Sequence, residues 1–89
     1  MALLRSDQVI LVAVELLNHY MGVGTFGVRD LGRVSGYDKN TVSYAIRRLQ
    51  GAGHLAYRKG PGRHYTYTVL KLQPEMLRAH YLLVESRIK

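Results

Sequence analysis

The sequence has no cysteine, only six acidic residues, and no apolar run long enough to cross a bilayer. Without cysteine, the chain forms neither disulfides nor thiolate metal sites, which suits a reducing compartment. A membrane-spanning helix needs roughly 20 apolar residues. The longest run here, "VILVAV" at 9–14, leads into Glu15, and no signal-peptide cleavage pattern follows it. We therefore expect a cytoplasmic protein.

The same scarcity argues against catalysis. We find no Ser/His/Asp set, no carboxylate pair and no redox group, so we expect a protein that is not an enzyme and needs no cofactor. The four histidines fall on separate segments without i, i+4 spacing or neighbouring acids, which argues against a shared metal site. They are His19, His54, His64 and His80.

The positive charge is confined to the middle of the chain. Residues 29–71 carry nine lysines and arginines against two aspartates, a balance of +7, which equals the net charge of the whole protein. The two flanks hold four basic and four acidic residues, a balance of zero. Charge segregated in this way suits one surface that meets a polyanion.

Hydrophobic periodicity and turn residues divide the 89 residues into the elements of one domain, 1–89. We expect helices at 7–20, 26–35, 38–52 and 74–89 and a β-hairpin at 54–70. Ser6 or Asp7 is expected to cap the first helix, and Asp38 the third. The third helix has apolar residues at i, i+3, i+4 and i+7, which predicts its inward face: Val42, Ala45, Ile46 and Leu49.

The first and last helices each carry apolar residues on two sides, which predicts burial on two sides. One side belongs to the core of the domain. The other predicts a homodimer formed through these two helices, with seven interface residues: Leu11, Val12, Val14, Leu77, Tyr81, Val84 and Ile88.

Polar and apolar residues alternate in "HLAYRKGPGRHYTYTVL", which predicts two antiparallel strands. A loop of residues 60–62 would pair Tyr57 with Tyr65 and Leu55 with Tyr67, and would place Lys59 beside Arg63 at the tip. We expect the hairpin tyrosines to be core or subunit contacts.

The segment "VRDLGRVSGYDKNTVSYAIRRLQGAGHLAY" within residues 25–69 resembles the winged helix-turn-helix family of DNA-binding regulators. The matching positions are Val28, Arg29, Leu31, Gly36, Thr41, Val42, Ser43, Ile46, Leu49, Gly53 and Leu55. The resemblance implies a mainly α fold with a small β-hairpin, in the order helix, helix, turn, helix, hairpin, helix. The third helix would then be the recognition helix and the hairpin the wing. Gly32 stands where the family favours alanine, and we expect it to loosen the packing of the second helix.

Two glycine-rich strings superficially match phosphate-binding loops. Such loops follow a strand and open a helix. "KGPGR" instead lies between two strands, and "GAGHLA" closes a helix and enters a strand. Both are therefore interpreted as turns, and the first as the tip of the wing.

The resemblance to the family assigns the exposed face of the third helix to the major groove of double-stranded DNA. We expect base contacts from Asn40, Tyr44 and Arg47, since asparagine to adenine and arginine to guanine are favoured pairings. Lys39, Thr41, Ser43 and Arg48 are expected to contact phosphate or sugar. The candidates in the wing are Arg58, Lys59, Arg63 and His64. Arg29 and Arg33 could also touch the backbone.

Several alternatives remain open at this level. The protein could be a transcription regulator or a nucleoid or plasmid-partition factor. It could instead be a protein-interaction module of transcription or replication machinery, because a fold does not settle a function. The seven tyrosines also allow a single-strand or RNA binder. Richness in Arg, Tyr and Val without cysteine is typical of a thermophilic microbe, archaeal or otherwise, or of its virus.

Overall fold

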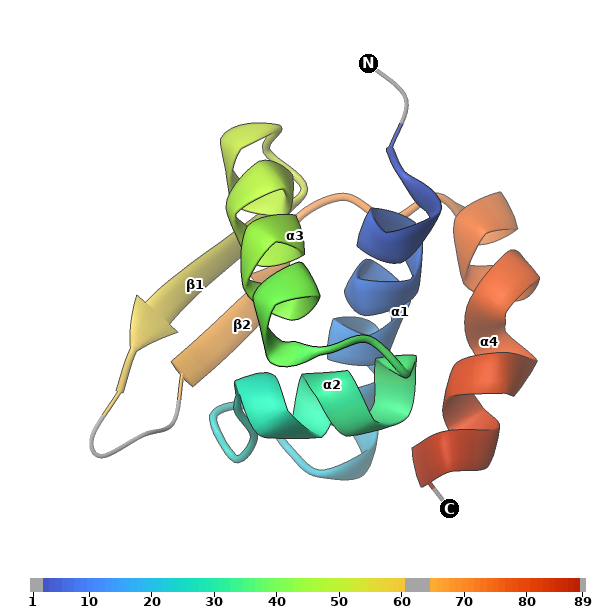
Figure 1. Ribbon diagram of the computed structural model, residues 1–89, viewed down its shortest axis with the longest axis horizontal. Helices are drawn as coiled ribbons and strands as arrows, with labels where there is room; N and C mark the ends of the chain where they lie inside the picture. The colour runs from blue at the N-terminus through green and yellow to red at the C-terminus, as the bar shows by residue number, and fades with distance from the viewer. Residues whose placement is uncertain (1–2, 61–64, 89) are drawn as a thin grey trace.

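The computed structural model describes residues 3–60 and 65–88 (Figure 1). In chain order the elements are α1 (Arg5–Tyr20), α2 (Val28–Ser35), α3 (Lys39–Gly51), β1 (Leu55–Lys59), β2 (Tyr65–Val69) and α4 (Pro74–Ile88). In the described part of the chain, four helices thus accompany one two-stranded antiparallel sheet. The fold prediction, a winged helix-turn-helix with a small hairpin, is confirmed.

Helix α1 lies at the centre of the molecule, between α3 and the hairpin on one side and α4 on the other (Figure 1). It is apolar around most of its circumference because neighbours surround it. Leu11, Val12 and Val14 are fully buried within the chain. Their assignment to a dimer interface is therefore wrong: the second side of α1 is covered by the chain's own elements.

The helix-turn-helix is formed by α2, a turn and α3. Gly36 ends α2 with φ of 82°, a conformation that glycine adopts without strain. Asp38 then caps α3, since its Oδ1 accepts from the backbone N–H of Thr41 at 2.7 Å. The predicted inward face of α3 is confirmed, because Val42, Ala45, Ile46 and Leu49 are all buried.

The turn packs closely on α2 because residue 32 is glycine. A Cβ atom added at Gly32 would lie 3.0 Å from the backbone oxygen of Tyr37, tighter than ordinary contact. The expectation that Gly32 loosens this helix is therefore wrong. Its missing side chain lets the turn approach the helix.

The hairpin pairs its strands in a different register from the predicted one. Tyr57 lies opposite Tyr67, Leu55 opposite Val69, and Lys59 opposite Tyr65. This register shifts the predicted pairing by two residues, so the same side chains still share a face. Phe26 stacks on Tyr67 with ring centroids 5.5 Å apart, and this contact holds β2 against the core.

Helix α4 packs against α1 and α2 through a narrow stripe. Val84 and His80 are its buried residues, and Leu77, Tyr81 and Ile88 are half-buried against the core. Val84 is fully buried within the chain, so its assignment to a dimer interface is wrong as well. The outer face of α4 exposes Leu82 and Leu83, at 76% and 38% of their surface.

Candidate nucleic-acid interface

The exposed face of α3 carries the side chains predicted for base contact. Asn40, Tyr44 and Arg47 are all exposed, and no acidic residue occurs between Lys39 and Gly51. The guanidinium carbon of Arg47 lies 5.9 Å from the centre of the Tyr44 ring, within the range of a cation–π contact. The two side chains therefore support each other while both stay accessible.

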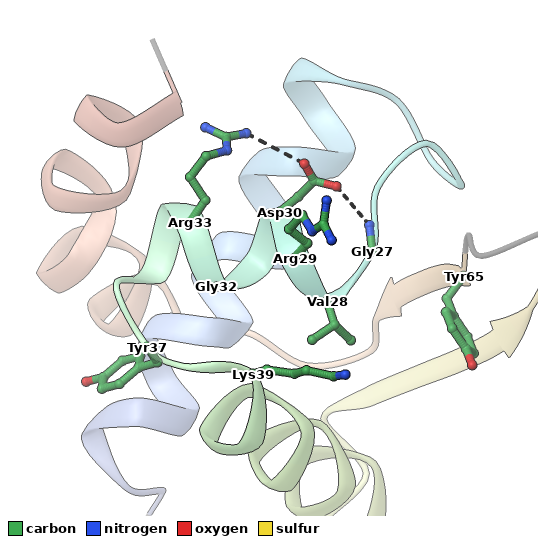
Figure 2. A pocket seen from close by; sticks show the side chains of 9 residues that line it. All are labelled: Gly27, Val28, Arg29, Asp30, Gly32, Arg33, Tyr37, Lys39 and Tyr65. Atoms are coloured by element: carbon green, nitrogen blue, oxygen red, sulfur yellow. Dashed lines mark hydrogen bonds and ion pairs between the residues drawn. The ribbon is translucent and has the colours of Figure 1, made fainter.

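A basic depression lies between α2, the start of α3 and β2 (Figure 2). It has a volume of about 870 Å³ and is lined by Gly27, Val28, Arg29, Asp30, Gly32, Arg33, Tyr37, Lys39 and Tyr65. Figure 2 shows the Lys39 side chain extending through the space between α3 and α2 toward Tyr65. Three cations thus surround one concave surface, and they come from two elements.

Asp30 is the only acid among the residues that line the depression, and its charge is already engaged. One carboxylate oxygen accepts the backbone N–H of Gly27 at 3.1 Å, and the other lies 3.7 Å from Arg33. Arg33 also donates to the backbone oxygen of Arg87 at the end of α4, at 3.3 Å. Arg33 therefore serves the fold in part, whereas Arg29 and Lys39 have no hydrogen-bond or ion-pair partner within the described residues.

A second, smaller groove separates α3 from the hairpin. Its volume is about 200 Å³, and its lining consists of Val28, Ser43, Ile46, Arg47, Tyr57, Tyr65 and Tyr67. It shares Val28 and Tyr65 with the basic depression, so the two hollows adjoin. The structure thus brings Lys39, Ser43 and Arg47 to the edge of one trough.

The candidate residues of the hairpin divide between its two faces. Alternation along β1 places Lys59 on the same face as Tyr57, which borders α3. Arg58 lies on the opposite face, and it lines a shallow hollow together with Ala56, Tyr57, Thr66 and Thr68. Arg63 and His64 lie outside the described residues.

Arg48 makes a different contact from the predicted phosphate contact. Its Nε and Nη2 atoms donate to the carboxylate of Asp7, with a shortest distance of 2.7 Å. Asp7 is 2% exposed, and the ion pair raises the pKa of Arg48. Ser6 or Asp7 was expected to cap α1, but the helix has no side-chain cap, and the carboxylate of Asp7 binds Arg48 instead. It fastens the first turn of α1 to the last turn of α3.

Sequence reasoning missed the contribution of the hairpin tyrosines to this surface. Their alternation predicted core or subunit contacts, and Tyr67, at 2% exposed, is a core residue. Tyr57 is 37% exposed and Tyr65 is half-buried, and both line the groove beside Arg47. Alternation identifies a shared face, but only the packing of α3 beside it shows that part of this face stays open.

Within residues 3–60 and 65–88, no three potential metal-ligating side chains converge on one point. The helices of the same region are also too short or too polar to span a bilayer.

Comparison with known proteins identifies the fold rather than a family. No family model matches the chain, and no curated protein matches it significantly. Solved structures that resemble it include two transcription regulators. One is MepR, a transcription regulator of the Staphylococcus aureus multidrug efflux pump MepA, with a TM-score of 0.53 and 12% identity over 92% of this chain. The other is the PcaV transcriptional regulator from Streptomyces coelicolor, with a TM-score of 0.51 and 25% identity over 89% of this chain.

The chain spans only about half the length of these structures, 56% of the first and 52% of the second. The similarity therefore covers most of this chain and leaves much of each neighbour unmatched. Both neighbours are transcription regulators, and the fold of this chain is the winged helix-turn-helix of such regulators.

Proposed function

We propose that this protein is a cytoplasmic transcription regulator that binds duplex DNA, with α3 in the major groove and the hairpin at the adjacent minor groove or its phosphates. One observation carries the proposal. The acid-free exposed face of α3 adjoins the basic depression and the hairpin, so that Arg29, Lys39 and Arg47 lie along adjoining hollows of one surface. A helix fits the major groove, and phosphate contacts from both sides would set its position.

Each candidate residue then makes a particular contact with the DNA or the fold. Asn40, Tyr44 and Arg47 contact base edges, because they project from the exposed face of α3. Arg29 on α2, Lys39 at the start of α3 and Lys59 on β1 contact phosphates. Arg48 contributes through its ion pair with Asp7, which fixes the end of α3.

The test is the binding of a fluorescent duplex, measured by anisotropy at increasing salt. If about six phosphates are contacted, the affinity falls roughly a thousandfold between 50 and 200 mM salt. The variants Lys39→Ala and Arg47→Ala should each weaken binding. Arg78→Ala removes the same charge from the exposed side of α4 and should bind as the wild type does. A wild-type affinity that is negligible or independent of salt would instead favour a protein-interaction module.

We also propose that the protein acts as a homodimer, now through the outer face of α4 rather than through α1. Leu82 and Leu83 are adjacent leucines exposed on this face, and Ala79 beside them is exposed too. Covering them with a second copy would remove apolar surface from water. Light scattering should give twice the chain mass for the wild type and the chain mass for Leu82→Lys. A monomeric wild type would contradict this proposal.

A further inference from the structure

The groove between α3 and the hairpin is lined with hydrogen-bond donors that the fold does not use. Its walls carry the hydroxyls of Ser43, Tyr57, Tyr65 and Tyr67 and the guanidinium of Arg47. No acidic residue belongs to the lining. Within the described part of the chain, the three tyrosine hydroxyls have no hydrogen-bond partner. A groove of this kind is matched to a ligand that accepts hydrogen bonds and carries negative charge.

The tyrosine rings are held in place by one another. The ring centroids of Tyr57, Tyr65 and Tyr67 lie 5.9 to 6.2 Å apart, and Tyr67 in turn stacks on Phe26. Aromatic pairs favour such spacings. The hydroxyls are therefore preorganised, and a ligand would not have to order flexible side chains.

Tyr67 is the most buried of the three tyrosines. It is 2% exposed and lines the groove, yet its hydroxyl has no partner within the described residues. Burial raises the pKa of Tyr67 to about 12, with smaller contributions from Tyr65 and Tyr57, so this hydroxyl keeps its proton at neutral pH. The hydroxyl therefore stays available at the groove as a donor for a ligand.

We propose that this groove seats one sugar–phosphate strand of the bound DNA, with Tyr57, Tyr65 and Tyr67 donating hydrogen bonds to its phosphate oxygens. This inference rests on the proposed function. When α3 occupies a major groove and the hairpin the adjacent minor groove, the strand that separates the two grooves crosses the space between them. Ser43 contacts that strand from the α3 side, and the apolar side chains of Val28 and Ile46 pack against its sugars.

The experiment removes hydroxyls without removing rings or charges. Tyr57→Phe, Tyr65→Phe and the double variant are compared with the wild type by anisotropy on one duplex at several salt concentrations. Each lost hydroxyl should weaken binding about 3- to 10-fold, because the net loss of one hydrogen bond is modest when water can take its place. The double variant should lose about 10- to 100-fold. The salt dependence should stay that of the wild type, because no charge is removed.

The matched control is Tyr81→Phe, which removes a hydroxyl that is bound to Glu85 on α4 instead of lining the groove. It should bind DNA as the wild type does. Lys39→Ala provides the charged comparison and should lower the salt slope by about one, because Lys39 is assigned a phosphate contact. Thermal unfolding of each variant shows that the hairpin remains folded.

The outcomes separate this inference from the proposed function. If Arg47→Ala weakens binding while the tyrosine variants bind as the wild type does, DNA binding stands and the groove assignment is overturned. Unchanged tyrosine variants together with tighter binding of single strands than of duplex would also overturn it, because phenylalanine preserves base stacking. If the wild type bound no nucleic acid, both the proposed function and the groove assignment would be overturned.

Discussion

The polar side chains on the two sides of the molecule differ in whether they have hydrogen-bond partners within the protein. On the α1–α4 side, polar side chains bind one another: Tyr20 and Tyr81 both donate to the same oxygen of Glu85 at 2.7 Å. Nε2 of His80 lies 3.1 Å from Oε1 of Gln8. On the side formed by α2, α3 and the hairpin, the tyrosine hydroxyls and several cations lack such partners within the described residues. The polar side chains named on the first side are paired with one another, whereas those on the second are available to a ligand.

The contrast is sharpest between two neighbouring arginines of α3. Arg47 projects from the exposed face beside Tyr44. Arg48 points toward α1 and forms an ion pair with the buried carboxylate of Asp7. One residue along a helix rotates the side chain by about 100°. That rotation separates a side chain available to DNA from one committed to the fold.

The largest expected effect comes from Arg48→Met. This change leaves the carboxylate of Asp7 buried without its partner, and breaking such a pair typically costs 3–5 kcal/mol. Because 44% of the Arg48 side chain is exposed, water can reach the pair, and we expect a loss of about 2–3 kcal/mol. Urea unfolding measures it. In the double variant Asp7→Asn/Arg48→Met most of the loss should be recovered, and a single-variant stability equal to that of the wild type would contradict the structural role.

Arg47→Met should have the opposite effects, with little change in stability and a clear loss of duplex affinity. Its side chain is exposed, so the free energy of unfolding should change by no more than about 0.5 kcal/mol. Duplex affinity should fall by about 1–3 kcal/mol if the guanidinium contacts a base edge. Urea unfolding and anisotropy on the same preparation provide the comparison. Equal effects of Arg47→Met and Arg48→Met on both measurements would remove the distinction between the two arginines.

A third prediction concerns pH on the α1–α4 side. Burial lowers the pKa of His80, with a smaller contribution from Arg5. The unfolded chain therefore binds the proton more readily, so the stabilising contribution is present above about pH 6.5 and is lost as the pH falls through the folded-state pKa. The free energy of unfolding should decline between pH 7 and pH 5, and less so in His80→Gln. Parallel curves for the two proteins would show that other groups cause the decline.

The smallest effect is expected at the cap of α3. The N–H groups of Thr41 and Asn40 lower the pKa of Asp38, so its contribution is present above the ordinary aspartate range and is lost in acid as the carboxylate protonates. Asp38→Ala should slightly lower the melting temperature at neutral pH, and Asp38→Asn should preserve it, because asparagine caps equally well. A loss for Asp38→Asn equal to that for Asp38→Ala would mean that the charge of Asp38, and not its capping hydrogen bond, provides the stabilisation.

Local sequence patterns predicted much of the structure of this protein. The predictions failed where the outcome depends on contacts between residues that are far apart in the sequence. The inward face of α3 and its cap follow from residues within a few positions of one another, so both were predictable. The hairpin register was mispredicted because alternation repeats every two residues and fits several pairings equally well. The roles of Asp7 and Arg48 depend on a contact across 41 residues, which no local pattern contains.

The amino-acid sequence alone determined the order of the helices and strands and the confinement of positive charge to the central segment, because both depend on neighbouring residues and composition. Only the tertiary structure decided that α4, and not a second chain, covers the outer side of α1, and that the tyrosines of the hairpin face Arg47 across an open groove. The physical reason is that burial and hydrogen-bond partnership are properties of surfaces assembled from distant segments.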